Sequence, residues 1–392
     1  MDLFEKCYKF TRAKEAMAQG LYPYFQAIES GASSEVVISG RKLFMLGSNN
    51  YLGLTQHPKV KEAAVKAIQK YGSGCTGSRF LNGTLTIHEE LEERLADFMG
   101  YEAALVFSTG FQTNQGAIST IVGKTDLILA DRQNHASIVD GCRLAFGRTV
   151  KFRHNDMDDL ERVLKNSNDG GKLIVVDGVF SMEGDVINLP RVAELALQYG
   201  AQVMVDDAHS IGVLGRNGRG TASHFGVKDK VGITMGTFSK SLASLGGFLV
   251  SSEPVIHYIK HHARSFIFSA SPTPASVASV LAALDIIESE PERIEKLWRN
   301  IRKMKKAFLE LGYNILNSDS AIIPLFIGDD TRTFLFWKML FNHGVFTNPA
   351  IAPAVEPGHG LIRTSYMATQ TDEVLDQVIE IFAKVGKESG II

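Results

Sequence analysis

Polar residues that could do chemistry together follow three apolar runs of the sequence. Asp206 and His209 follow one run, Lys240 follows a second, and His135 comes a few residues after a third. If these runs are parallel strands, their carboxyl ends meet at one edge of a sheet, where open α/β sheets bind ligands. An acid, a lysine and two histidines at such an edge have a known chemical use.

That use is to bind pyridoxal phosphate, a cofactor that acts as an electron sink while its ring nitrogen stays protonated. A buried carboxylate such as Asp206 holds that proton, and a lysine such as Lys240, with a pKa lowered by burial, forms the resting imine. The phosphate needs hydroxyls and the backbone N–H groups of a helix N-terminus. Thr237 and Ser239 offer hydroxyls, and the segment 108–111 lies just before a helical stretch.

Each of these residues alone has a commoner role. A lysine after a serine is usually solvated, and an aspartate such as Asp206 after a strand more often caps a helix. His135 could equally be a polar loop residue. Their occurrence together, in order and at strand ends, is what favours the cofactor site.

The sequence also predicts the sheet that must position these residues. Runs rich in Val, Ile and Leu alternate with helical stretches such as Met157–Leu164 and Arg191–Gln198. This pattern is typical of an α/β fold with a mostly parallel sheet covered on both faces. The seven predicted strands are Ala104–Phe107, Leu127–Ala130, Thr149–Phe152, Leu173–Val176, Val203–Val205, Ile233–Met235 and Phe248–Val250.

The pattern changes after about residue 285. A charged helix (Glu290–Leu311), a strand (Ile322–Ile327) and helices at Thr333–Phe341 and Thr371–Val385 indicate a smaller α+β domain. At 392 residues the chain exceeds what one hydrophobic core usually supports. We expect an N-terminal segment, a large cofactor-binding domain and a C-terminal domain, at residues 1–45, 46–285 and 286–392.

A glycine-rich stretch has the residue spacing of a dinucleotide-binding site. Gly72, Gly74 and Gly77 match the G-x-G-x-x-G spacing of a dinucleotide-binding loop. That loop needs a strand before it and a helix opening within it, whereas residues 60–71 have a helix pattern. We therefore expect a tight loop at the active-site mouth and no nicotinamide site.

Composition argues against several other classes of function. A net charge of −2 gives no reason to expect nucleic acid. Three cysteines are too few for a disulfide framework or a zinc site, so we expect a reduced cytoplasmic setting. No apolar run reaches the roughly 18 residues of a membrane span, and the charged N-terminus lacks the apolar core of a secretory signal. That terminus looks helical and amphipathic; packing on a subunit or domain is the favoured interpretation, with peripheral contact at the inner membrane face as the alternative.

The sequence resembles the α-oxoamine synthases, a family of fold-type-I pyridoxal-phosphate enzymes, nearly from end to end. The motifs are Gly47–Leu54, Val205–His209, Gly236–Lys240 and Leu361–Arg363. Members condense a small amino acid with an acyl-CoA and release carbon dioxide and CoA. The stretches GSRFLNGTLTIHEELE, DGVFSMEGD and FSASPTPASVAS are most similar to those of bacterial members that use L-serine and palmitoyl-CoA and make 3-oxosphinganine for sphingolipid synthesis. Members that make 8-amino-7-oxononanoate, 2-amino-3-ketobutyrate or 5-aminolevulinate share the catalytic core and remain alternatives.

The resemblance implies roles for the residues at the cofactor. Lys240 would hold it and move protons at the substrate α-carbon, and Asp206 would pair with the ring nitrogen. His209 would hydrogen-bond the phenolate oxygen, and His135 would stack on the ring. The phosphate would be held by Gly110, Phe111, Thr237 and Ser239, with Ser269 and Ala270 coming from a neighbouring subunit, since the family builds its sites at a homodimer interface.

The resemblance also implies substrate contacts. Asn50 and Arg363 would bind the amino-acid carboxylate, Ser181 would lie near the ring, and Tyr71 would lie near the substrate. One departure concerns a mobile arginine that some members carry in a loop before the last motif. Ile351 stands at that position here. If such an arginine assists decarboxylation, Arg363 or another group must replace it.

Two rival functions share parts of this pattern. A fold-type-I aminotransferase or carbon–sulfur lyase uses the same lysine and aspartate but releases no CoA. A non-catalytic relative would be expected to lose the lysine, whereas this chain keeps Lys240 together with Asp206, His135 and His209.

Overall fold

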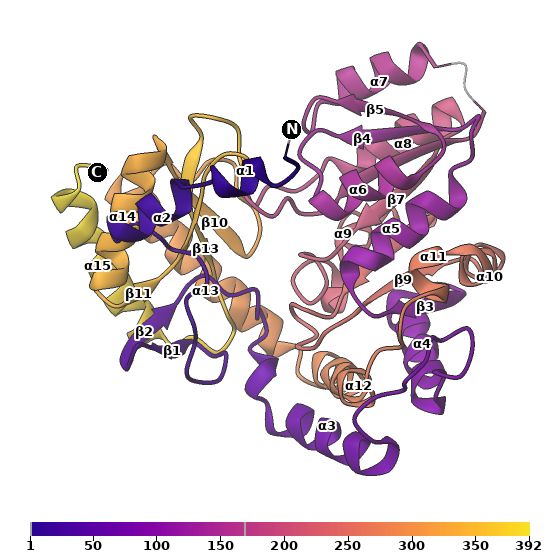
Figure 1. Cartoon of the computed structure of the whole chain (residues 1–392), viewed down its shortest axis with the longest axis horizontal. Helices are drawn as coiled ribbons and strands as arrows, with labels where there is room; N and C mark the ends of the chain where they lie inside the picture. Colours follow the sequence, from indigo (N-terminus) through magenta and orange to yellow (C-terminus); the bar gives the residue numbers. More distant parts are fainter. Residues whose placement is uncertain (1, 168–169) are drawn as a thin grey trace.

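The computed structural model describes residues 2–167 and 170–392, which form a larger and a smaller lobe (Figure 1). The larger lobe contains the long sheet. The smaller lobe holds the C-terminal part of the chain, and the indigo N-terminal segment lies against it. The space between the lobes is where the carboxyl ends of the central strands point, so residues from both can reach it.

The larger lobe is built on a seven-stranded sheet in the order β3-β9-β8-β7-β6-β4-β5. All strands are parallel except β9, which is antiparallel to both of its neighbours. Each predicted strand is confirmed, within one or two residues at either end. The strands are β3 (Ala103–Phe107), β4 (Leu127–Asp131), β5 (Arg148–Phe152), β6 (Lys172–Asp177), β7 (Gln202–Asp206), β8 (Ile233–Thr237) and β9 (Gly247–Ser251).

Helices cover both faces of this sheet because successive strand residues point to opposite sides. In β4, Ile128 and Ala130 pack in a core with α5, α6, α10 and α11, whereas Leu127 and Leu129 pack in a second core with α7 and α8. The covering helices are α5 (Gly110–Ile121), α6 (Ala136–Leu144), α7 (Met157–Lys165), α8 (Leu189–Tyr199), α10 (Glu253–His262) and α11 (Arg264–Ile267).

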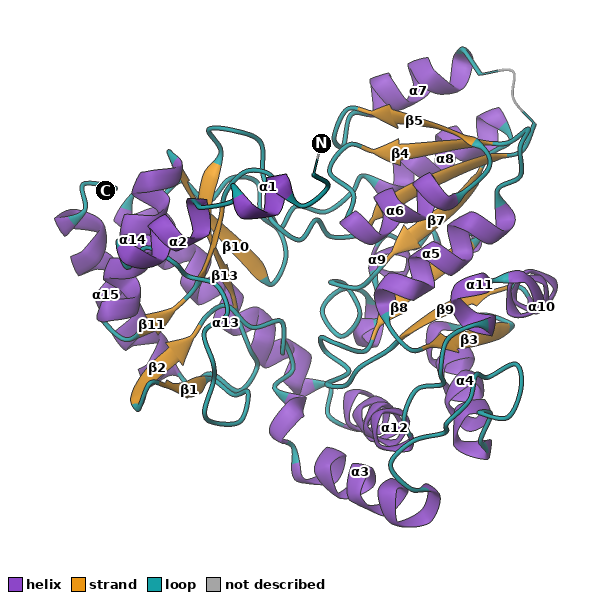
Figure 2. Ribbon diagram, in the orientation of Figure 1, coloured by secondary structure: helices purple, strands orange, loops and turns teal. Residues whose placement is uncertain are grey.

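The smaller lobe contains two three-stranded sheets and the long helices α13, α14 and α15, all visible in Figure 2. One sheet has the order β10-β13-β12 and the other the order β1-β2-β11. The pairing of β2 with β11 attaches the predicted N-terminal segment to the C-terminal domain. The elements are β1 (Glu35–Ile38), β2 (Arg41–Met45), β10 (Ile322–Gly328), β11 (Val345–Phe346), β12 (Asn348–Ala350), β13 (Gly360–Ser365), α13 (Glu292–Leu311), α14 (Asp330–Asn342) and α15 (Asp372–Glu388).

The remaining helices lie at the chain start and around the sheet edge. The predicted N-terminal helix is two short ones, α1 (Glu5–Tyr8) and α2 (Arg12–Ala18), neither with a buried residue. The helix predicted before the glycine-rich stretch is α3 (Pro58–Tyr71), which ends at Gly72 with a φ of 85°. α4 (Thr86–Met99) and α12 (Pro274–Ser289) pack near α3 and β3. Across the described residues, no helix is both long and apolar enough to cross a bilayer.

Candidate active site

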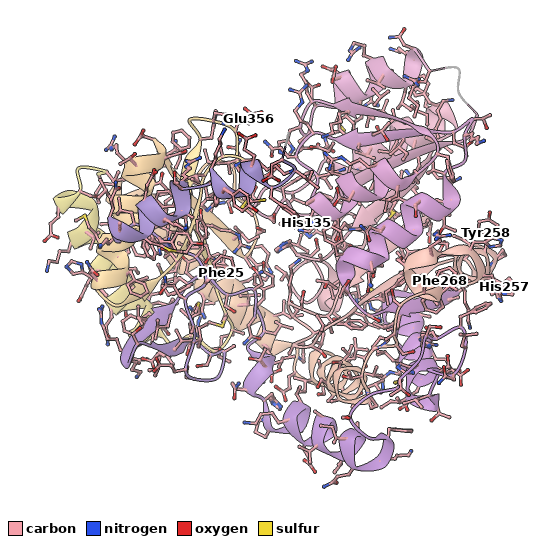
Figure 3. All side chains as sticks on the ribbon, viewed as in Figure 1. Phe25, His135, His257, Tyr258, Phe268 and Glu356 are labelled. Atoms are coloured by element: carbon pink, nitrogen blue, oxygen red, sulfur yellow. The ribbon has the colours of Figure 1, made fainter. Side chains whose placement is uncertain are left out.

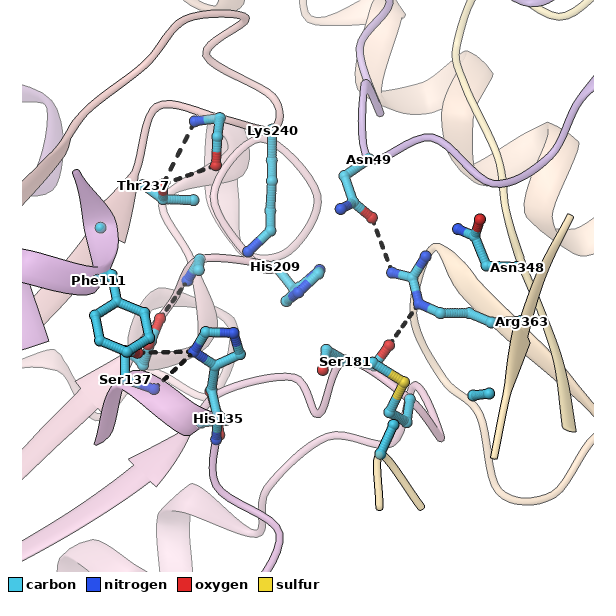
Figure 4. A pocket seen from close by; sticks show the side chains of 18 of the residues that line it. Asn49, Phe111, His135, Ser137, Ser181, His209, Thr237, Lys240, Asn348 and Arg363 are labelled. Atoms are coloured by element: carbon cyan, nitrogen blue, oxygen red, sulfur yellow. Dashed lines mark hydrogen bonds between the residues drawn. The ribbon is translucent and has the colours of Figure 1, made fainter. Parts of the chain in front are cut away.

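A cavity of about 630 Å³ lies at the carboxyl ends of β6, β7 and β8 and extends to the smaller lobe. Lys240, Asp206 and His209 line it from the strand ends, and Arg363 lines it from β13. Figure 3 shows His135 at the place where the two lobes face one another. The chemistry that the sequence predicted from separate strand ends is thus gathered around one space (Figure 4).

Lys240 lies in the cavity with two carboxylates nearby. Burial lowers the pKa of its amine to about 8, while the charges of Asp206 and Asp177 oppose that shift. A lysine with an ordinary pKa is almost wholly protonated at neutral pH. The lowered pKa of Lys240 leaves an appreciable neutral fraction, which is the form that can act as a nucleophile or base.

Asp206 is buried at the end of β7 and held by two hydrogen bonds. Its Oδ1 accepts the backbone N–H of Ala208 at 2.9 Å, and its Oδ2 accepts Asn114 Nδ2 at 2.6 Å. The same Asn114 amide donates to Ser137 Oγ at 2.8 Å. Asn114 on α5 therefore fixes the orientation of the carboxylate and ties it to the first turn of α6, whose N-cap is His135.

The ring of His135 has a defined hydrogen-bonding pattern. The backbone N–H of Ser137 donates to His135 Nδ1 at 3.2 Å, and Ser137 Oγ lies 2.7 Å from the same nitrogen. Desolvation by the surrounding protein lowers the pKa of His135, so the ring is neutral. Because Nδ1 accepts, Nε2 must carry the single hydrogen of the neutral ring.

Arg363 comes from β13 and is almost completely buried. Its Nε donates to the Ser181 carbonyl at 2.6 Å, and its Nη2 donates to Asn49 Oδ1 at 2.9 Å. A guanidinium has five N–H donors, so these two bonds fix its plane and leave others for an anion in the cavity.

The N-terminus of α5 forms another part of the cavity wall. Helix N-termini leave backbone N–H groups without intrahelical partners, and here Gly110 and Phe111 occupy the first turn. A Cβ on Gly110 would lie 2.9 Å from Thr237 Oγ1, so only glycine leaves this space open. Thr237 and Ser239 place their hydroxyls 3.0 Å apart beside it.

These features fit pyridoxal phosphate. The open space at Gly110 and the two hydroxyls suit a phosphate, Asp206 suits a protonated ring nitrogen, and the low-pKa Lys240 suits the aldehyde carbon. His135 offers its Nε2–H to the same cavity, which His209 also lines. The residues that would hold the cofactor are Lys240, Asp206, His135, His209, Gly110, Phe111, Thr237 and Ser239, with Ser181 near by.

Two predicted substrate-binding residues are not among the cavity-lining residues. Asn50 Nδ2 donates to Thr55 Oγ1 at 2.8 Å, and the neighbouring Asn49 lines the cavity in its place. The hydroxyl of Tyr71 lies 3.0 Å from Thr86 Oγ1 at the end of α3. The geometry therefore favours Asn49 over Asn50 for the contact with Arg363.

Ser269 and Ala270 lie beside the start of α5 but do not line the cavity of their own chain. Ser269 Oγ accepts from Gln112 Nε2 at 3.0 Å, and the Ala270 carbonyl accepts from the Ser108 hydroxyl. Their role in a neighbouring subunit stays a prediction.

Asp177 is the chief site residue that the sequence reading overlooked. It ends β6, pairs in register with Asp206, and accepts the backbone N–H of His135 at 2.8 Å. Burial, followed by the charge of Asp206, raises the pKa of Asp177. Asp177, like Asp206, directly follows a buried apolar run, and this position is the sequence signal that indicates it.

Comparisons with known proteins agree with this geometry. Residues 41–382 match the family model for aminotransferase class I and II. The serine palmitoyltransferase of Sphingobacterium spiritivorum is 52% identical over 390 residues, covering 99% of this chain and 98% of that protein. An 8-amino-7-oxononanoate synthase of Treponema denticola is 43% identical, covering 97% of each chain.

A solved structure extends the similarity to the whole fold. The serine palmitoyltransferase of S. paucimobilis, solved with a bound PLP–myriocin aldimine, superposes with a TM-score of 0.97 at 36% identity, covering 100% of both chains. Sequence, fold and site geometry therefore agree. The chain belongs to the fold-type-I family of pyridoxal-phosphate-dependent enzymes and, within it, to the α-oxoamine synthases.

Proposed function

We propose that the protein is a serine C-palmitoyltransferase that condenses L-serine with palmitoyl-CoA and yields 3-oxosphinganine, CoA and carbon dioxide. The observation that carries this proposal is a single cavity that combines the side chains of Lys240 and Arg363 with an apolar wall. The similarity to serine palmitoyltransferases, over nearly the whole chain, supports serine as the amino acid.

The apolar wall suits a fatty acyl group. Phe111 and Leu245 contribute to it from the larger lobe, and the segment 349–354, which contains Ile351, contributes from the smaller lobe, where β12 pairs with the strand that carries Arg363. Burying a methylene group in such surroundings stabilises a complex by about 0.8 kcal/mol. Ile351 adds to this apolar surface at the place where some relatives carry an arginine, so Arg363 is the cation that the cavity offers to a carboxylate.

When bound, pyridoxal phosphate supplies an electron sink for negative charge that develops at the α-carbon of the amino acid. The protein's residues perform the remaining work. Arg363, held by Asn49 and the Ser181 carbonyl, binds the serine carboxylate. Lys240 in its neutral form takes the proton from the α-carbon and later returns one there. Asp206 keeps a proton on the ring nitrogen, which preserves the sink.

The acyl group then joins the α-carbon and the CoA thiol leaves. The carboxylate now lies next to a ketone, an arrangement from which carbon dioxide is lost easily. The apolar wall excludes water, which would otherwise hydrolyse the thioester.

We also propose that the enzyme is a homodimer with shared sites. Phe80, Leu81 and Phe268 are at least half exposed, and the loop that carries Phe80 meets the 268–271 segment through the Ser78–Ala270 bridge. Figure 3 shows Phe268 in the larger lobe, on the same side of it as His257 and Tyr258. A second copy over this surface would bury the three apolar side chains and bring Ser269 and Ala270 to its neighbour's site.

For location, we propose the cytoplasm with peripheral contact at the inner membrane face. The cysteines of the described chain are free thiols, as a reducing compartment favours. Leu3, Phe4, Tyr8 and Phe10 are exposed near the chain start, as apolar side chains that enter a lipid interface would be.

A substrate panel tests the reaction. Serine, alanine and glycine are each combined with acyl-CoAs of several lengths, and free CoA thiol is measured with time. Serine with palmitoyl-CoA should give the highest kcat/KM; a preference for alanine with a shorter thioester would indicate 8-amino-7-oxononanoate synthesis, and no CoA release would contradict the proposal.

Lys240→Ala is the matched control for that panel. It should abolish CoA release and, in the absence of amino acid, the visible absorbance of the imine between lysine and cofactor, because no other lysine is among the residues lining the cavity. Full colour and turnover in this variant would contradict the assigned role of Lys240.

A further inference from the structure

Behind His209 lies a tyrosine that does not line the cavity. Tyr51 is completely buried, and its Oη is 2.6 Å from His209 Nδ1. His209 itself lines the cavity, and only its Nδ1 has a hydrogen-bond partner within the described chain. Its Nε2 is thus the nitrogen left to meet a ligand.

The hydrogen of a neutral imidazole sits on one nitrogen, and the partner of the other nitrogen decides which. Burial, then the charges of Lys240 and Arg363, lowers the pKa of His209, so its ring is neutral. Burial raises the pKa of Tyr51 to about 12 despite the nearby Arg363, so its hydroxyl keeps its hydrogen.

That hydroxyl has two acceptors within reach. Asn49 Oδ1 is 3.4 Å away and already accepts Arg363 Nη2, whereas His209 Nδ1 is 2.6 Å away. The shorter contact is well inside the range of an O–H donor, and the longer one is at its limit. The hydroxyl hydrogen therefore belongs on the side of His209.

We propose that Tyr51 is a positioning residue whose hydroxyl donates to His209 Nδ1 and thereby fixes the tautomer that presents Nε2–H to the cavity. His135 offers a parallel, because Ser137 donates to its Nδ1 and leaves Nε2–H for the same space. Both histidines then act as hydrogen-bond donors, the form that an anionic oxygen of the bound cofactor requires. This proposal about Tyr51 rests on the proposed function in one respect, the identity of the oxygen that accepts from His209.

The same contacts join the two binding regions of the site. Asn49 accepts from Arg363 and also lies against the Tyr51 hydroxyl. The carboxylate-binding guanidinium and the cofactor-facing histidine are thus held by adjacent residues of one segment, Asn49 and Tyr51. A displacement of this segment changes both contacts together.

The experiment measures the histidine tautomers directly. The enzyme, loaded with pyridoxal phosphate and labelled with ¹⁵N-histidine, is examined by long-range ¹H–¹⁵N correlation NMR, and the loss of signals in His209→Gln assigns the ring. We expect the protonated-nitrogen shift at Nε2 and the unprotonated shift at Nδ1. A hydrogen on Nδ1 in the wild-type protein would overturn the proposal, and this arm needs no substitution at Tyr51 and no substrate.

A second arm uses Tyr51→Phe with Tyr366→Phe as the matched control. Tyr366 is also completely buried, and its hydroxyl lies 2.9 Å from Thr364 Oγ1. Neither residue is among those that line the cavity. Tyr51→Phe should give averaged His209 shifts, altered visible absorbance of the cofactor and about tenfold lower kcat/KM, the size expected for one buried hydrogen bond. Tyr366→Phe should keep the wild-type His209 shifts. Unchanged His209 shifts in Tyr51→Phe would overturn the proposal even if the substrate panel identified a different acyl donor.

Discussion

Asn49 and Asn50 are neighbours in the chain, but their side chains have different surroundings. Asn49 Oδ1 accepts from Arg363 in the cavity, while Asn50 Nδ2 donates to Thr55 Oγ1 and lies 3.4 Å from the Ala32 carbonyl. Asn49 therefore orients the group that binds the substrate carboxylate. Asn50 instead holds the segment 46–53 against the rest of the smaller lobe.

This difference predicts opposite effects for two alanine substitutions. Asn49→Ala should raise the KM for serine about tenfold, because a hydrogen bond to a charged group contributes more than a neutral one. Asn50→Ala should lower the melting temperature and leave the KM for serine within about twofold of wild type, since the side-chain hydrogen bonds that it loses run to Ala32 and Thr55, neither of which lines the cavity. Steady-state kinetics and thermal denaturation of both variants check this, and a larger KM change in Asn50→Ala would reverse the assignment.

Among the elements, the connection after β6 is held in place by a partly buried cation. His154 Nδ1 lies 3.0 Å from Asp131 Oδ1 at the end of β4, and its Nε2 lies 3.0 Å from Asp185 Oδ2 in that connection. Burial alone would lower the pKa of His154, but the bonds and charges of the two carboxylates raise it to about 10. The connection carries Ser181, whose carbonyl orients Arg363, so this ion pair supports the site from outside the cavity.

The raised pKa of His154 gives a testable dependence of stability on pH. Between about pH 6.5 and pH 10 the folded protein binds a proton at this ring that the unfolded chain has released, so the stabilisation declines as pH rises. The difference in the free energy of unfolding between the wild type and His154→Gln should therefore shrink as pH rises, by on the order of 1 kcal/mol per pH unit. Thermal denaturation across this range measures it. His224→Gln, at an exposed histidine, is the control, and a constant gap between wild type and His154→Gln would contradict the prediction.

The positions of side chains can be predicted from the sequence where the chain forms regular elements with a periodic apolar pattern. Asp206 and Lys240 could be predicted because buried strands have a recognisable pattern and their ends converge. Asn49 and Asn50 could not be told apart, because residues 46–53 form no regular strand or α-helix whose period would say which side chain faces inward. The pairing of β2 with β11 could not be predicted from the sequence either, because it joins segments about 300 residues apart that only tertiary packing brings together.

At the scale of the whole molecule, Ala270 is the residue that we expect one chain to contribute to the site of another. Ala270 is exposed beside the start of α5, and its backbone carbonyl accepts from the Ser108 hydroxyl of the same chain. Its side chain is therefore free to face a neighbour. In the proposed homodimer, it lies next to the phosphate of the cofactor that the other chain holds.

A subunit-mixing experiment decides this. Lys240→Ala removes the cofactor lysine, and Ala270→Asp places a negative charge where we expect the other chain's phosphate, so each homodimer should be inactive. A mixed dimer contains one chain of each variant. The Ala270→Asp chain still has Lys240, and the Lys240→Ala chain still has Ala270. One of the two sites combines these two intact residues and is therefore complete. Unfolding and refolding an equal mixture should therefore restore about a quarter of wild-type CoA release, because half of the dimers are mixed and each has one complete site. If each chain built its site alone, no mixture would regain activity, and an active Ala270→Asp homodimer would remove Ala270 from the phosphate site altogether.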